Sequence, residues 1–148
     1  MLIFALYNSY KMKNKETAKR YFDAMVAGNF DEMNKLKTPD CVYWLSGEGS
    51  WPFGGYQSLE NQAKLWGTVA ERFPTGMKMT LQSITADEER AALYVHIRGT
   101  RKDGRIYENN VMLLLIYKDG LISGLYEYLD TIMVNELFCG PMDDVKNS

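Results

Sequence analysis

Residues 121–140, LISGLYEYLDTIMVNELFCG, contain an apolar and aromatic strand followed by a short helical tail. Side chains of a strand alternate between its two faces, so Glu127 shares a face with Leu125 and Leu129. A carboxylate among leucines is costly unless it has a partner. Two interpretations follow from this pattern. Glu127 is either an edge residue or half of a core ion pair, or it lies at the floor of an apolar pocket.

The rest of the chain predicts helices first and strands afterwards. Apolar residues at helical spacing predict helices over residues 16–28, with Asn14 as the N-cap, over residues 30–37, and from Ser58 to Pro74. Alternating residues predict strands over 41–45, 77–85, 90–100 and 106–118, before the final strand. Three helices followed by antiparallel strands predict an α+β fold, in which the helices lie on one face of a curved sheet.

Residues 111–117 (VMLLLIY) are apolar on both faces of their predicted strand. An antiparallel sheet with one solvated face should instead alternate apolar and polar residues. The outer face therefore needs a cover, and we expect a second subunit there. The alternative is an edge masked by the N-terminal residues. The contacts that we expect in this homodimer involve Met112, Leu114, Tyr126 and Tyr128.

The composition restricts the class of protein. A chain of 148 residues, with 46% hydrophobic and 24% charged residues, predicts one globular domain with a sizeable core. The net charge of −2 and the lack of a Lys/Arg stripe argue against a nucleic-acid partner. With two cysteines and one histidine, we expect neither a disulfide framework nor a metal site.

The chain opens with an apolar run, MLIFALY, that is too short to span a membrane. A signal peptide would have basic residues before such a run and a small-residue cleavage site after it, and this run has neither. We interpret residues 1–13 as an N-terminal extension, residues 14–140 as the domain and residues 141–148 as a C-terminal tail. The prediction is a cytoplasmic protein without a membrane partner.

Several motifs along the chain resemble those of a known family. They are Ala27-Gly28-Asn29-Phe30-Asp31, Val42-x-Trp44 with Gly47 and Gly55-Tyr56, Gly99-Thr100 with Asp103-Gly104-Arg105-x-Tyr107-Glu108-Asn109, and Asp119-Gly120-Leu121-Ile122 followed by Tyr126-Glu127-Tyr128-Leu129-Asp130-Thr131. Their order resembles the SnoaL-like branch of the nuclear transport factor two-like superfamily, which includes ketosteroid isomerases and limonene-epoxide hydrolases. The resemblance covers residues 14–138 and implies a cone-shaped, mixed but mostly antiparallel sheet wrapped around the three helices.

The strand at residues 90–100 holds the only histidine and allows two orientations. Strand parity alone turns its aliphatic residues inward and His96 outward. The resemblance implies the opposite, because the matching strand of the epoxide hydrolases points an arginine and an aspartate into the cavity. On that basis the inward set is Tyr94, His96 and Arg98.

In that orientation His96 faces the carboxylate of Glu127. A histidine and a carboxylate in a dry cavity form an acid–base unit. Arg98 is the alternative partner, which would keep Glu127 ionised. Tyr21 matches the position of the isomerase phenol on the first helix, so the resemblance implies a donor to an oxyanion. The catalytic candidates are thus His96, Glu127 and Tyr21, with no cofactor or metal.

The sequence departs from both reactions of the family. Leu45-Ser46-Gly47 stands where the isomerases have their base, and the apolar Leu113 stands near their protonated aspartate. The strand with His96 lacks the aspartate of the hydrolases. Steroid isomerisation is therefore disfavoured, and epoxide hydrolysis would require an altered form.

In the family's layout, aromatic residues surround the mouth of the cavity, which implies an apolar, flat or polycyclic ligand. The residues that we expect to bind this small hydrophobic ligand are Trp44, Tyr56, Trp66, Tyr94, Arg98 and Asn109. Two classes of function remain open. One is a cofactor-independent enzyme (an isomerase, hydrolase, lyase such as a dehydratase, or cyclase), and the other is a ligand-binding or dimeric scaffold domain without turnover.

Overall fold

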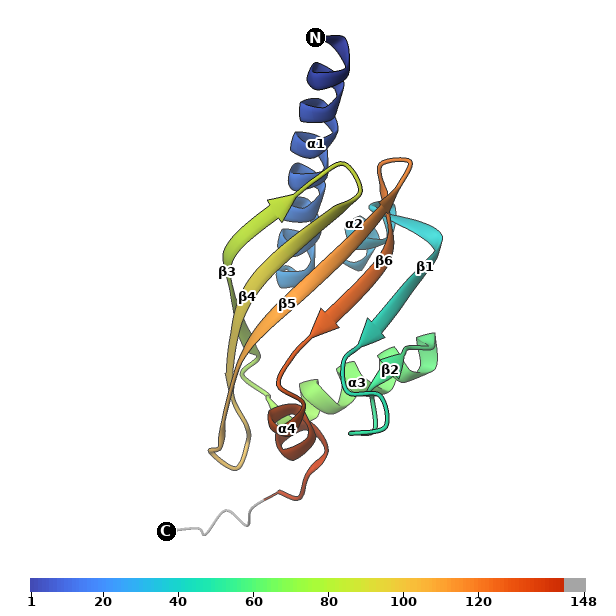
Figure 1. Ribbon diagram of the computed structural model, residues 1–148. Coiled ribbons are helices and arrows are strands. Elements are labelled where there is room, and N and C mark those ends of the chain that lie inside the picture. Colours follow the sequence, from blue (N-terminus) through green and yellow to red (C-terminus); the bar gives the residue numbers. More distant parts are fainter. Residues whose placement is uncertain (143–148) are drawn as a thin grey trace.

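Six strands form one curved sheet in the computed structural model, which describes residues 1–142 (Figure 1). They are β1 (Lys37–Leu45), β2 (Gly55–Tyr56), β3 (Met77–Ala86), β4 (Arg90–Thr100), β5 (Ile106–Lys118) and β6 (Leu121–Tyr128). Their order across the sheet is β2-β1-β6-β5-β4-β3. Neighbouring strands are antiparallel except β1 and β6, which are parallel. The predicted α+β fold with a mixed, mostly antiparallel sheet is confirmed.

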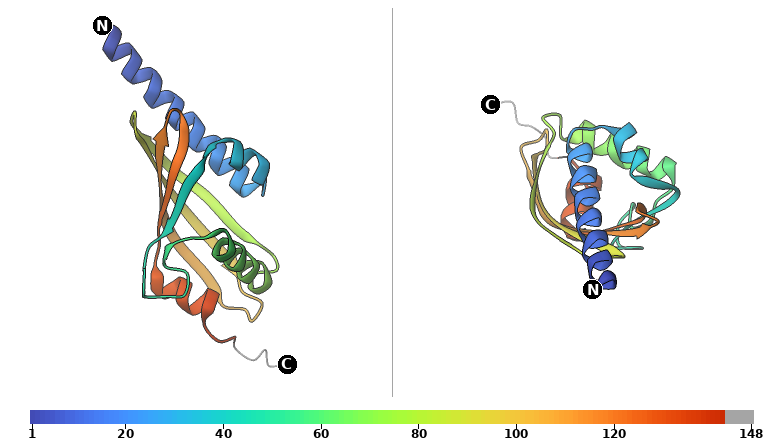
Figure 2. Two further views of the ribbon diagram at one scale, coloured as in Figure 1. Left: turned by 90° about the vertical axis from the view of Figure 1, so that its right-hand side faces the viewer. Right: turned by 90° about the horizontal axis from the view of Figure 1, so that it is seen from above.

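Three helices lie on the concave side of this sheet (Figure 2). They are α1 (Leu2–Val26), α2 (Phe30–Lys35) and α3 (Leu59–Arg72). Ser58 caps α3 as predicted, because its hydroxyl accepts a hydrogen bond from the backbone N–H of Asn61 at 3.0 Å. At the end of the sheet away from the N-terminus, α4 (Thr131–Val134) continues into the short π-helix η1 (Asn135–Cys139). These two elements close the wall of the cone.

Helix α1 begins earlier than the sequence predicts. Asn14 is not its N-cap but a buried residue inside a continuous helix. The side-chain amide of Asn14 donates a hydrogen bond to the carbonyl oxygen of Asp87 at 2.9 Å, between β3 and β4. The first turns project beyond the sheet and expose most of their apolar side chains (Figure 2). The boundary predicted at residue 13 therefore falls inside one helix.

Two further findings concern the ends of the chain. Among the described helices, α1 included, none combines the length and apolar character that crossing a membrane requires. Of the predicted tail at residues 141–148, everything after Met142 lies outside the described residues.

The core has two parts inside the cone. The first lies between α1 and the sheet, where Tyr21 and Phe22 belong to the same buried cluster as Leu93. The second joins α3, β5 and η1, where the ring of Phe138 stacks on Tyr107 with centroids 4.8 Å apart. Residues of both clusters contribute to the walls of one cavity.

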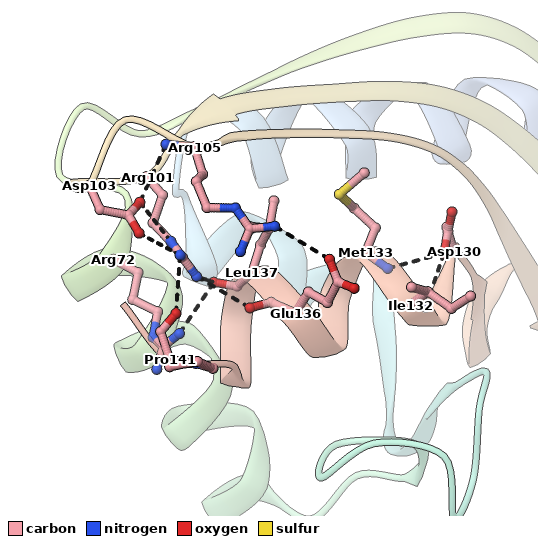
Figure 3. Close-up of polar contacts among 10 residues, drawn as sticks. All are labelled: Arg72, Arg101, Asp103, Arg105, Asp130, Ile132, Met133, Glu136, Leu137 and Pro141. Carbon is pink, nitrogen blue, oxygen red and sulfur yellow. Dashed lines mark hydrogen bonds and ion pairs between the residues drawn. The ribbon is translucent and has the colours of Figure 1, made fainter. Parts of the chain in front are cut away.

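A buried arginine fixes the segment that closes the cone (Figure 3). Arg101 forms an ion pair with Asp103. Its guanidinium also donates hydrogen bonds to the carbonyl oxygens of Glu136 and Leu137, at 3.2 and 3.3 Å. The carbonyl of Glu136 also accepts a hydrogen bond from the backbone N–H of Gly140, and that of Leu137 accepts one from Arg72. Arg101 adds to these contacts and holds η1 against the sheet.

Candidate active site

A cavity of about 540 Å³ lies between the concave face of the sheet and the helices. This volume is typical of sites for small molecules. Most of its lining residues are aliphatic or aromatic. Phe30 of α2 and Leu59 and Trp66 of α3 line the cavity and are also exposed, so the mouth lies between these two helices.

Glu127 faces this cavity from β6, beside Leu125 and Leu129, as strand alternation predicts. The hydroxyl of Tyr43 on β1 donates a hydrogen bond to Oε2 of Glu127 at 2.6 Å. The parallel pairing of β1 with β6 explains this contact. Tyr43 pairs with Leu125 and Leu45 pairs with Glu127, so the long side chain of Tyr43 has to reach only two residues further along β6. Within residues 1–142, Glu127 forms no ion pair.

The surroundings of Glu127 favour its protonated form. Burial raises the pKa of this carboxyl above its ordinary value of 4.5, and the hydrogen bond from Tyr43 opposes that rise. Glu127 keeps some accessible surface only because it borders the cavity, and it lies deep in the protein. Burial and the charge of Glu127 raise the pKa of Tyr43 in turn. The carboxyl of Glu127 can therefore exchange a proton with a bound molecule while the phenol of Tyr43 stays neutral.

Two more buried phenols lie near Glu127. Tyr21 of α1 lines the cavity, and burial raises its pKa, with smaller contributions from Cys41 and Glu127. Tyr107 of β5 also lines the cavity, and its pKa is raised by burial and then by Glu127. Both phenols remain neutral at physiological pH and can donate hydrogen bonds. In the part of the chain that the structure describes, no cluster of three or more His, Cys, Asp or Glu side chains could hold a metal ion.

The inward set predicted for β4 is wrong. Tyr94, His96 and Arg98 lie on the outer face of the sheet, and none of them lines the cavity. Nε2 of His96 is 2.9 Å from Oε1 of Glu108, whose side chain is 55% exposed. The aliphatic residues, such as Val95, face the interior instead. Burial of aliphatic surface stabilises this orientation, and it is the one that strand parity alone predicts.

The aromatic residues predicted to bind ligand divide between two surfaces. Trp66 lines the mouth of the cavity. Trp44 lies on the outer face, with its ring centroid 5.3 Å from that of Tyr128. Tyr56 pairs with Trp44 across β1 and β2, so it shares that face and is 64% exposed. The expectation that Trp44 and Tyr56 line the cavity is therefore wrong, because the neighbours of Trp44 on β1, Tyr43 and Leu45, are the ones that face inward.

Asn109 points inward but does not line the cavity. It is buried, and its side-chain oxygen accepts a hydrogen bond from the backbone N–H of Asp130 at 3.1 Å. Its amide nitrogen donates to the hydroxyl of Tyr107 at 3.0 Å. Asn109 thus fixes the start of α4 and orients a phenol that does line the cavity, in place of the predicted contact with ligand.

Tyr43 is the site residue that the sequence patterns do not identify. Both faces of the strand at residues 41–45 are apolar or aromatic, so alternation alone does not distinguish Tyr43 from Trp44. The only signal is the carboxylate of Glu127, which lies far along the chain and needs a hydrogen-bond donor. That signal becomes usable only when the pairing of β1 with β6 is known.

The comparisons with known proteins agree with this architecture. A family model described as "SnoaL-like domain" matches residues 18–125. Among curated proteins there is no match.

Solved structures resemble the chain over most of its length. An NTF2-like protein from Burkholderia xenovorans LB400 has a TM-score of 0.67 and 20% identity, covering 86% of this chain and 97% of that chain. A proposed SnoaL-like polyketide cyclase from Jannaschia sp. CCS1 has a TM-score of 0.70 and 16% identity, covering 88% and 94%. TerC, co-crystallised with polyporic acid, has a TM-score of 0.71 and 16% identity, covering 85% and 98%. At these identities the likeness shows the fold.

Proposed function

We propose that this chain, which belongs to the SnoaL-like domain family, binds a small apolar molecule in its conical cavity and transforms it by acid–base chemistry without a cofactor. The observation that carries this proposal is the carboxyl of Glu127. It faces the cavity, it has Tyr43 as a neutral hydrogen-bond partner, and it forms no ion pair within the described residues. A structural carboxylate in such a position would normally have a cationic partner.

Glu127 is suited to move a proton within a bound molecule. As a carboxylate it accepts a proton from an acidic carbon or hydroxyl of the ligand, and as an acid it returns that proton to another atom. The neutral phenol of Tyr21 can donate a hydrogen bond to the ligand oxygen that gains negative charge. The enzyme ends the cycle as it began, which fits isomerase, cyclase or dehydratase chemistry. Tyr43 positions the carboxyl and limits the rise of its pKa.

The walls of the cavity support an apolar ligand of moderate size. Apart from the groups around Glu127 and a few polar residues at one end, the lining is aliphatic and aromatic. Trp66 at the mouth offers a flat surface for a ring system. The proposed polyketide cyclase and the TerC complex with polyporic acid, both similar in fold, support an organic ligand of this kind.

Turnover by a matched pair of variants tests the proposal. Ligands that copurify with the protein are identified by mass spectrometry, and product formation is followed with the compound found. Glu127→Gln should lower turnover by about 10²- to 10⁴-fold while ligand binding persists. The control is Glu108→Gln, which removes a carboxylate from the outer face and should leave turnover unchanged. Full turnover by Glu127→Gln would reject the acid–base role.

A binding domain without turnover is the second candidate. The observation in its favour is that His96, the only histidine, lies outside the cavity, so Glu127 has no imidazole to share a proton with. In that case the wild type and Glu127→Gln would both bind the copurified compound, and neither would convert it.

We also propose that two copies associate through the outer face of the sheet. Strand register arranges the apolar residues of this face in two rows, one with Trp44, Tyr126 and Leu114, the other with Tyr128, Met112 and Tyr94. Such a patch is typical of a protein interface. Sedimentation should give a dimer at micromolar concentration, and Trp44→Glu should give a monomer. A monomeric wild type would contradict the proposal.

A further inference from the structure

We propose that the cavity binds an anionic group of its ligand at the end formed by α2 and the start of β1, so that the ligand is an apolar acid. This inference rests on the proposed function, because it names the ligand class of the same cavity. Its central residue is Lys37, the first residue of β1. Among the described residues that line the cavity, Lys37 is the only one with a cationic side chain.

Lys37 has no protein partner for its charge within residues 1–142. The ion pairs of the described chain involve other cations, such as Lys19 with Asp23 and Lys102 with Glu71. Lys37 is also half-buried at the wall of the cavity. A ligand anion would supply the missing partner.

Lys37 also acts electrostatically on a neighbour in the cavity wall. Burial raises the pKa of the Cys41 thiol, and the positive charge of Lys37 opposes this rise. Cys41 lines the cavity from the same strand. Lys37 and Cys41 therefore both border the cavity from the first half of β1.

Thr38 is a second, independent indication of a ligand at this end. It lines the cavity, and its hydroxyl oxygen is buried without a hydrogen-bond partner in the described chain. Buried hydroxyl groups are nearly always hydrogen-bonded in native proteins. Asn34 of α2 lines the same end and adds an amide. An ammonium, a hydroxyl and an amide at one end of the cavity are donors that suit a carboxylate or a similar anionic oxygen.

This end of the cavity is well separated from Glu127. Tyr43, which contacts Glu127, follows Lys37 along β1 by six residues, which corresponds to roughly 20 Å at 3.3 Å per residue. The irregular register between Lys37 and Val42 shortens this distance. An elongated ligand can therefore place its acid group at Lys37 and its reacting atoms at Glu127, without repulsion between the two negative charges.

Fluorescence titration with two probes of one shape tests the inference. The probes are anthracene-2-carboxylate and the neutral anthracene-2-carboxamide, titrated at pH 8 into the full chain. The wild type should bind the acid about tenfold more tightly than the amide. Lys37→Met should abolish this preference while the affinity for the amide stays the same. The matched control is Lys35→Met, which removes an exposed charge two residues away that does not line the cavity.

Thr38→Val is a second variant for the same titration. It removes the hydroxyl that we expect to donate to the ligand, and both probes carry an oxygen that can accept this hydrogen bond. The variant should weaken binding of the acid and of the amide alike, and Glu127→Gln should leave the preference for the acid intact.

The outcomes separate this inference from the proposed function. Equal affinity of the wild type for acid and amide, or equal effects of Lys37→Met and Lys35→Met, would overturn the anion site while leaving binding in the cavity established. If neither probe bound to the wild type, the proposed apolar ligand site would fail, and the anion site with it.

Discussion

Two buried carboxylates of this protein have opposite surroundings. The side chains of Asp103 and its partner Arg101 are 1% and 0% exposed, and the same arginine binds backbone carbonyls of the closing segment. Glu127 borders a cavity and has a hydrogen bond from the neutral hydroxyl of Tyr43. Within the described chain, one carboxylate has a full cationic partner and the other has none.

This difference distinguishes a structural charge from one available for chemistry. The buried ion pair of Arg101 with Asp103 fixes the geometry around it, because the same guanidinium also binds the carbonyls of Glu136 and Leu137. Burial raises the pKa of the Glu127 carboxyl, and this carboxyl borders the cavity, where it can exchange a proton with a bound molecule. Leaving such a group in an apolar cavity lowers stability, which is a common feature of functional sites.

The largest effect on stability is expected at the structural pair. Arg101→Met removes a buried cation from the ion pair with Asp103 and hydrogen bonds from the carbonyls of η1. The free energy of unfolding should fall by about 3–5 kcal/mol, measured by urea denaturation with circular dichroism.

Arg105→Met is the matched control for this variant. The ion pair between Arg105 and Glu136 is long, at 3.4 Å, and both side chains are exposed. Its loss should cost less than about 1 kcal/mol. Equal costs for Arg101→Met and Arg105→Met would show that the buried pair has no special structural role.

A smaller effect is expected from the neutral partner of Glu127. Tyr43→Phe keeps the ring but removes the hydrogen bond to the carboxylate. At pH 8, where Glu127 has more of its charge, the variant should lose about 1.5–3 kcal/mol of unfolding free energy, and less at pH 5. Tyr128→Phe, which removes an exposed hydroxyl from the outer face, should cost almost nothing. A cost for Tyr43→Phe that does not depend on pH would mean that the ionised carboxylate does not need this hydroxyl.

The smallest effect is a change with pH. Burial raises the pKa of Glu127, so its contribution to stability is complete below the ordinary value of 4.5 and is lost as the pH rises through the raised value. The stability of Glu127→Gln relative to the wild type should therefore increase between pH 4.5 and pH 8, as measured by thermal melting. The opposite slope is expected if an undetected cation holds Glu127 ionised.

The sequence predicts the fold better than it predicts the site. Alternation and the Asp103-Gly104 turn place β4 and β5 at the residues where the structure has them, and alternation also turns Glu127 inward. These features depend on local patterns, which is why one strand at a time is enough to predict them. The N-terminal extent of α1 is missed because Asn14 resembles a cap, whereas its amide is satisfied by Asp87 from another hairpin.

The errors at the site have two different causes. His96 is turned outward by the burial of its aliphatic neighbours, a preference that the resemblance to the hydrolases does not override. Tyr43 and Arg101 have partners that lie far along the chain, at Glu127 and at the carbonyl of Leu137. No pattern within one element contains such a contact, so only the assembled sheet reveals it.

Carbon NMR titration of the Glu127 carboxyl tests the central claim most directly. The protein is labelled at the glutamate side-chain carboxyl, and the resonance of Glu127 is assigned by its absence from Glu127→Gln. We expect a midpoint above 4.5, with a further increase in Tyr43→Phe, because the hydrogen bond from Tyr43 stabilises the charged form. A midpoint at or below 4.5 would contradict this expectation, since it would mean that the surroundings of Glu127 stabilise its charged form.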